Sequence, residues 1–190
     1  MTDKTLNCCF TGYRPAKFPF EFSTADPRYA AFEASLLEAI FSLPKENCFT
    51  FYTGMAMGFD ILAAEMVLLL KEKGDCVVNL ICVLPFKNQT AGWDEDWKKR
   101  YDNVLKNADE VILLSEEYYK GCYFKRNNFM VDNSDLVLTY FDGAMGGTAA
   151  TLKYAAKNNK KIINLADSDI NMMTYCDYIS LADVPEEDDE

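Results

Sequence analysis

Basic residues and glycines recur in this sequence directly after short apolar runs. The first apolar run is followed by Gly12 and Arg14, and the second by Gly54, Gly58 and Asp60. Glycine lets a ligand approach the backbone closely, and the planar guanidinium group of arginine suits a phosphate or a carboxylate. These residue types predict a site that binds an anion.

Two further segments carry the same chemistry. A Gly-Gly-Thr sequence ending at Thr148 follows a later apolar run, and at a helix start it can hold a phosphate through backbone N–H groups, with Thr148 as the expected N-cap. Arg126 is expected at the first position of a short helix, where it opposes the helix dipole and therefore needs a specific partner. The predicted ligand-binding residues, which we expect to converge on one site, are Gly12, Arg14, Gly54, Gly58, Asp60, Arg126, Gly146, Gly147 and Thr148.

The absence of histidine narrows the catalytic chemistry. Triads and zinc sites that use imidazole are excluded, so proton transfer falls to carboxylates, Lys, Tyr or Cys. Asp60 is an N-cap, a ligand contact or both. Glu65 stands in an otherwise apolar segment, and it either reaches the sheet edge as a site carboxylate or extends to water. The candidate catalytic residues are Arg126, Glu65 and Asp60.

The known nucleotide and metal motifs are missing. The turn from Gly54 to Asp60 has neither the Gly-Lys-Ser/Thr of a P-loop nor the GxGxxG spacing. The seven cysteines form no CxxC pair, so we expect them to be reduced and mostly buried, and we expect no transition metal. A nucleotide-type ligand is the only cofactor expected, and magnesium accompanying its phosphate stays open.

The segments that position these turns alternate between strands and helices. Apolar runs predict strands at residues 5–11, 47–53, 76–84, 110–114, 135–140 and 161–165. Helical spacing predicts helices at residues 29–43, 60–73, 93–108, 126–132 and 148–157. This alternation implies parallel pairing, and we expect one α/β Rossmann-like, doubly wound, mainly parallel sheet with helices on both faces. Ligands bind beyond the carboxyl ends of such strands, where the turns lie.

Length, charge and composition set the remaining limits. A chain of 190 residues with 49% hydrophobic content predicts one domain, at residues 1–168, followed by an extension at 169–190 whose last six residues are a solvated acidic tail. A net charge of −11 disfavours nucleic acid, and the basic triplet at residues 98–100 is expected on a solvated helix face. No signal pattern or long apolar stretch appears, so we expect a cytoplasmic protein with no membrane partner.

Several of these motifs together resemble the YpsA-like family of uncharacterised bacterial proteins, over about residues 7–165. The resemblance is carried by Cys8-Cys9-Phe10-Thr11-Gly12-Tyr13-Arg14-Pro15, Gly54-Met55-Ala56-Met57-Gly58-Phe59-Asp60 with Ala63-Ala64-Glu65, Pro85-Phe86 with Gln89 and Trp93, Arg126-Asn127, and Gly146-Gly147-Thr148. It implies membership of the SLOG superfamily, with the DNA-processing protein DprA and the LOG phosphoribohydrolases. That superfamily implies a Rossmann-like fold and a nucleotide or nucleotide-derived ligand.

The sequence departs from this pattern at two positions. Tyr13 stands where the family usually has His, and Thr151 stands where LOG enzymes carry a Glu that acts on the ribosyl bond. We therefore favour a nucleotide-binding or sensing domain. The alternative is an N-glycosidase of nucleotides or ADP-ribose-like substrates, with Glu65 or Asp60 in place of the missing carboxylate. Single-stranded DNA binding of the DprA kind fits poorly with the net charge.

A homodimer is also expected. The resemblance to LOG enzymes implies one, and the aromatic-rich stretch at residues 118–124 is costly to leave exposed.

Overall fold

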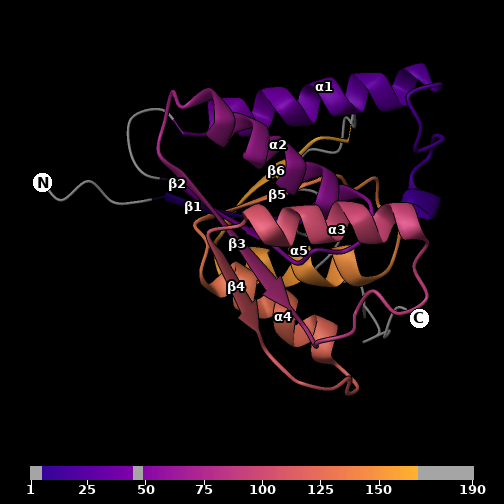
Figure 1. Ribbon diagram of the computed structural model, residues 1–190, viewed down its shortest axis with the longest axis vertical. Helices are drawn as coiled ribbons and strands as arrows, with labels where there is room; N and C mark the ends of the chain where they lie inside the picture. The colour runs from indigo at the N-terminus through magenta and orange to yellow at the C-terminus, as the bar shows by residue number, and fades with distance from the viewer. Residues whose placement is uncertain (1–5, 45–48, 167–190) are drawn as a thin grey trace, which may run out of the picture.

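A computed structural model describes residues 6–44 and 49–166 as a three-layer α/β domain (Figure 1). Its parallel strands are β1 (Leu6–Thr11), β2 (Phe49–Thr53), β3 (Val78–Leu84), β4 (Glu110–Leu113), β5 (Leu136–Thr139) and β6 (Lys161–Asn164). Its helices are α1 (Pro27–Ser42), α2 (Phe59–Lys73), α3 (Glu95–Asn107), α4 (Cys122–Asp132) and α5 (Gly147–Lys157), with a short 3-10 turn η1 (Pro15–Lys17) after β1.

The sheet has the strand order β4-β3-β2-β1-β5-β6. Strand β1 lies in the middle, where Cys8 pairs with Phe51 of β2 and with Leu136 of β5. The chain builds outward from β1 to β4 and then returns to the other side of β1 with β5. Strands β1 and β5 therefore form the switch point at which a doubly wound sheet opens a crevice.

Helices cover both faces of the sheet. Helix α2 packs against both α1 and α3, and α4 packs against α5. Right-handed crossovers place the first three helices on one face and the last two on the other, and Figure 1 shows α1 and α4 on opposite sides of the sheet. The expected doubly wound, Rossmann-like fold is confirmed.

The central strands are mostly apolar because both of their faces are buried in the core. Cys8, Cys9 and Phe10 of β1 are completely buried, because helices cover both faces of a parallel sheet. The cysteines that the structure describes are all free, and four of them are buried while Cys76 is partly exposed, as expected. Cys48 and Cys176 lie outside the described residues.

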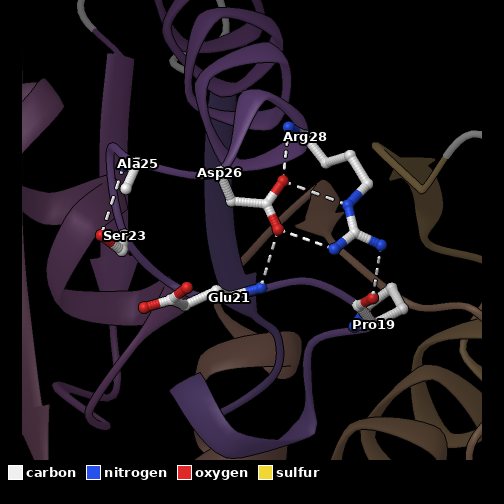
Figure 2. Close-up of polar contacts among 6 residues, drawn as sticks. All are labelled: Pro19, Glu21, Ser23, Ala25, Asp26 and Arg28. Atoms are coloured by element: carbon white, nitrogen blue, oxygen red, sulfur yellow. Dashed lines mark hydrogen bonds and ion pairs between the residues drawn. The ribbon is translucent and has the colours of Figure 1, made fainter.

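A polar network fixes the start of α1, the helix that follows the long loop after η1 (Figure 2). Asp26 is the N-cap and accepts hydrogen bonds from the backbone of Arg28 at 2.9 Å and from its guanidinium at 2.7 Å. These bonds from Arg28 hold the pKa of Asp26 well below its usual range. Arg28 also donates to the carbonyl of Pro19, which ties the loop to the helix.

The element boundaries agree with the predicted ones to within a few residues, except at α4. This helix begins at Cys122 and not at residue 126, because Gly121 adopts a left-handed conformation (φ 86°) and starts the helix one turn earlier. The predicted extension at 169–190, with its acidic tail, lies outside the described residues. Among the helices of residues 6–44 and 49–166, none has the length and apolar character needed to cross a membrane.

Candidate anion-binding site

A cavity of about 400 Å³ lies at the carboxyl ends of the central strands. Its wall is formed by the loop after β1, the turn after β2, the start of α4 and the start of α5. Six predicted ligand-binding residues line it: Gly12, Arg14, Asp60, Arg126, Gly147 and Thr148. Its volume falls within the ~300–1,000 Å³ that is usual for small-molecule sites.

Arg126 lies in the wall of this cavity and is only 5% exposed. It occupies the second turn of α4, so the expectation that it opens the helix was wrong. Its guanidinium donates to the carbonyl of Gly54 and, at 2.7 Å, to Oδ1 of Asn127. These are the specific partners that hold it, and they leave other N–H groups of the five on a guanidinium for a ligand.

Gly54 contributes to the site by giving space to that arginine. A Cβ atom at this position would overlap the guanidinium of Arg126. The turn that follows is closed on itself, because Met55 N–H donates to Thr53 and Ala56 N–H donates to Asp60. Two N–H groups of this turn therefore have partners within the protein, and the binding of an anion by the turn stays a prediction.

Gly58 allows the turn after β2 to lie close to the loop after β1. Its φ of 97° suits glycine, and a Cβ would lie 2.6 Å from the carbonyl oxygen of Tyr13. The next residue, Phe59, donates its backbone N–H to that same carbonyl at 3.1 Å. Gly58 is thus the N-cap of α2, in place of the predicted Asp60, and it lies beside the cavity.

Asp60 is a buried carboxyl in the first turn of α2 and is 4% exposed. Burial raises its pKa to about 6, and the positive charges of Arg126 and Arg14 act in the opposite direction. Its Oδ2 accepts the N–H of Ala56 at 3.4 Å. Asp60 thus lines the cavity as a buried carboxyl whose pKa is raised to about 6.

Glu65 does not belong to this cavity. It accepts two hydrogen bonds from the Arg100 guanidinium of α3, at 2.8 and 2.6 Å. Its side chain is 27% exposed and is bound by Arg100 between α2 and α3, and it is not among the residues that line the cavity. Lys98 and Lys99 of the same basic triplet pair with Glu95 and Asp96, as expected for a solvated face.

The start of α5 is tied to the loop after β1. Gly146 is the N-cap with φ 143°, and Thr148, which was predicted to cap the helix, donates instead to the carbonyl of Gly12 at 3.1 Å. Gly147 and Thr148 line the cavity, whereas Gly146 supports the turn from outside it. A Cβ on Gly146 would lie 2.9 Å from Nζ of Lys17.

Thr151 connects α5 to α4 beneath the cavity. It is 1% exposed, donates to the carbonyl of Gly147 at 2.8 Å and accepts from Asn127 at 2.9 Å. Asn127 in turn accepts from Arg126. At this position the chain has a positioning network and no carboxylate.

Tyr13 takes a role that its sequence position did not indicate. It is 2% exposed, and its hydroxyl donates to Asp142 at 2.6 Å while accepting the N–H of Ala144 at 3.1 Å. Burial raises the pKa of this phenol well above its usual range, so it stays protonated. Tyr13 fastens the loop between β5 and α5 to the loop after β1.

The lining residues that were not predicted to bind a ligand include two cations, Lys17 and Lys120, and two aromatic residues, Tyr123 and Phe124. Lys17 follows Pro15 closely, and η1 turns it back toward the strand ends. The sequence signal for the others was the basic and aromatic stretch before Arg126, which we had interpreted only as a surface for association. Tyr123 also places its ring 5.8 Å from the Arg126 guanidinium.

The cavity is positively charged although the protein is acidic. Arg14, Lys17, Lys120 and Arg126 line it, and Asp60 is the only carboxylate among its described lining residues. The whole chain carries a net charge of −11. A cleft with charge opposite to that of the surface concentrates anions. Among residues 6–44 and 49–166, no group of three or more His, Cys, Asp or Glu is placed to hold a metal ion.

The fold and the cavity define a Rossmann-like α/β domain with a polar site at its switch point. The model of the YpsA family, described as the YspA SLOG family, matches residues 8–178. The chain belongs to this family.

Two curated relatives support this assignment. The chain is 35% identical over 127 residues to the uncharacterized SPbeta prophage-derived protein YoqJ of Bacillus subtilis, covering 60% of this chain and 74% of the relative. It is 27% identical over 157 residues to a UPF0398 protein of Bacillus thuringiensis, covering 81% of this chain and 84% of the relative.

Two solved structures share the fold. DNA processing protein A (DprA) of Streptococcus pneumoniae superimposes with a TM-score of 0.60 at 16% identity, over 93% of this chain and 56% of that one. DprA of Helicobacter pylori gives a TM-score of 0.59 at 17% identity, over 94% of this chain and 81% of that one. The latter structure is described in terms of its single-stranded DNA binding mode. The chain thus spans little more than half of the Streptococcus protein, and at these identities the likeness establishes the fold.

Proposed function

We propose that the cavity binds a nucleotide or a nucleotide-derived phosphorylated ligand, and that the protein is a cytoplasmic nucleotide-binding or sensing domain. The observation that carries this proposal is the convergence of four cationic side chains on the switch point of an otherwise acidic protein. Phosphate binds best where charge-assisted donors and a helix N-terminus meet, as they do beside Gly147 and Thr148.

Three further features support a nucleotide in particular. The cavity volume of about 400 Å³ suits a mononucleotide-sized molecule. The rings of Tyr123 and Phe124 in its wall offer faces on which a base can stack. The SLOG relationship and the DNA-binding description of the Helicobacter neighbour are consistent with ligands built from nucleotides.

The proposal is tested by isothermal titration calorimetry with a panel of nucleoside phosphates. We expect wild-type protein to bind at least one of them, and Arg14→Ala to weaken that binding by about tenfold, because one charge-assisted contact is lost. Lys98→Met is the matched control, since Lys98 pairs with Glu95 on α3. Absence of binding across the panel would contradict the proposal, and tight binding of an oligonucleotide alone would favour the DprA-like alternative.

The N-glycosidase alternative is favoured by one observation, the buried carboxyl of Asp60. A pKa of about 6 lets a carboxyl group take up or donate a proton near neutral pH, and Arg126 lies in the same wall. Against it, Thr151 replaces the carboxylate that the resemblance to LOG enzymes requires. Chromatography of nucleoside monophosphates and NAD-like compounds after incubation decides this point: free base released by wild type and not by Asp60→Asn would support the enzyme.

We also propose that the protein forms a homodimer through the stretch at residues 118–124. Tyr118 is 55% exposed and Tyr119 is 39% exposed, next to the aromatic contacts of Phe86 with Tyr118 and Tyr123. Light scattering at micromolar concentration is expected to give twice the chain mass, and Tyr118→Ser to reduce the dimer fraction. A monomeric wild-type mass would contradict this.

A further inference from the structure

A chain of three hydrogen bonds connects Arg126 to the first turn of α5. Nε of Arg126 donates to Oδ1 of Asn127 at 2.7 Å, and Nδ2 of Asn127 donates to Oγ1 of Thr151 at 2.9 Å. The hydroxyl of Thr151 donates in turn to the carbonyl of Gly147 at 2.8 Å. A guanidinium can only donate and a carbonyl can only accept, so the two ends fix the direction of every bond in this chain.

Thr151 differs from the other members of this chain in its position. Arg126, Asn127 and Gly147 all line the cavity. Thr151 is not among the lining residues, and it is only 1% exposed. Any influence of its hydroxyl on a ligand must therefore pass through the residues to which it is hydrogen-bonded.

The same chain determines which N–H groups of Arg126 a ligand can use. Asn127 accepts from Nε, and the carbonyl of Gly54 accepts from Nη1. Among the described residues, none accepts a hydrogen bond from Nη2. The side of the guanidinium that carries Nε is thus occupied, and its far end, with Nη2 and the second N–H of Nη1, is left for an anion.

We propose that Thr151 is a positioning residue for the anionic group of the ligand. Through Asn127 it fixes the end of the Arg126 guanidinium relative to the N–H groups at the start of α5, so that both bind the same phosphate. This inference rests on the proposed function and adds to that site a residue which does not touch the ligand. Hydrogen bonds in a chain strengthen one another, and donors that are already held in place lose less freedom when a ligand binds.

Isothermal titration calorimetry of the full chain tests this with the mono- and diphosphates of adenosine, guanosine, cytidine and uridine. Thr151→Val keeps the shape of the side chain and removes the hydroxyl, so the amide of Asn127 loses its acceptor. We expect the nucleotide that wild type binds most tightly to bind about three- to tenfold more weakly. Thr151→Ala also lacks the hydroxyl and is expected to show the same loss, so the test does not depend on the folding of one variant.

Two further variants serve as controls. Thr151→Ser restores the hydroxyl and is expected to bind within about twofold of wild type. Thr139→Val makes the same exchange at another buried threonine, at the end of β5, whose hydroxyl has no hydrogen-bond partner among the described residues and which does not line the cavity. Its affinity is also expected to stay within about twofold of wild type.

A double-mutant cycle separates positioning from a general loss of structure. In an Arg126→Ala background there is no guanidinium to hold, so adding Thr151→Val is expected to change the affinity by less than about twofold. A loss of equal size in both backgrounds would overturn the inference, as would unchanged affinity of Thr151→Val in the wild-type background. Either result leaves nucleotide binding intact, whereas failure of wild type to bind any of these nucleotides would refute the proposed function together with the inference.

Discussion

Two of the carboxylates of helix α2, Asp60 and Glu65, differ sharply in their surroundings. Glu65 accepts hydrogen bonds from Nε and Nη2 of Arg100 at the α2–α3 surface, and its side chain is 27% exposed. Asp60 is 4% exposed at the floor of the cavity, beside an Arg126 that donates to Gly54 and Asn127.

The difference separates a structural pair from a candidate site. A bidentate pair near solvent has its hydrogen bonds satisfied and contributes little free energy, so Glu65 and Arg100 join two helices and have nothing to offer a ligand. A buried carboxyl with a raised pKa costs free energy, and such groups gather at functional sites. On the proposed function, Asp60 and Arg126 mark the place where stability is given up for binding.

The largest effect is expected from filling the cavity. Gly147→Val places a branched side chain at the first turn of α5, where the proposed function puts a phosphate, and nucleotide binding is expected to be abolished. Ala144→Val, which places the same side chain at an exposed position of the preceding loop, is the control and is expected to bind normally. Calorimetry measures both, and unimpaired binding by Gly147→Val would remove the phosphate from this turn.

The buried carboxyl predicts a pH dependence of stability. The pKa of Asp60 is about 6 in the folded protein and about 3.9 unfolded, so the folded state holds the proton more tightly. The free energy of unfolding is therefore least affected by Asp60 below pH 4, where the carboxyl is protonated in both states. It falls as the pH rises to 6, and above pH 6 the buried charge lowers it by roughly 3 kcal/mol. Urea unfolding from pH 4 to pH 7 is expected to show a smaller decline for Asp60→Asn, whereas Glu65→Gln retains the wild-type decline. An unchanged decline in Asp60→Asn would contradict the burial argument.

The two arginines provide the matched test of binding. Arg126→Ala is expected to weaken nucleotide binding by about ten- to a hundredfold with the fold retained, because ~1.5–3 kcal/mol of charge-assisted contact is lost. Arg100→Ala is expected to leave affinity within about twofold of wild type. Circular dichroism confirms folding, and equal losses in the two variants would erase the distinction between the two regions.

The smallest effect is expected at the surface pair. Glu65→Gln is expected to lower the free energy of unfolding by about 0.5 kcal/mol at low salt, and by less at high salt, since the pair is partly exposed and screened. Urea unfolding at two salt concentrations measures this. A loss of several kcal/mol would show that this pair, too, is a buried charge site.

The sequence predicted the elements and the edge of the sheet that carries the site, because both follow from local patterns. Continuous apolar runs indicated β1 and β5, and the residues that follow them identified Gly12, Arg14 and Thr148 as lining groups. The fold class, the free cysteines in the described part and the family followed from the same local information.

The roles within the site could not be predicted, because they depend on contacts between distant segments. The hydrogen bond of Arg126 to Gly54 spans 72 residues, and that of Thr148 to Gly12 spans 136. Glycine spacing alone could not show that Gly54 makes room for an arginine and not for a phosphate. Equally, nothing local distinguished Glu65 from Asp60, since the partner of each comes from a different helix.

Hydrogen–deuterium exchange with and without saturating adenosine diphosphate compares the two regions in one experiment. The account predicts slower exchange in the loop after β1 and at the starts of α4 and α5, with little change around Trp97 and Arg100 of α3. Protection confined to Trp97 and Arg100 of α3, or no protection anywhere, would contradict a nucleotide site at the switch point.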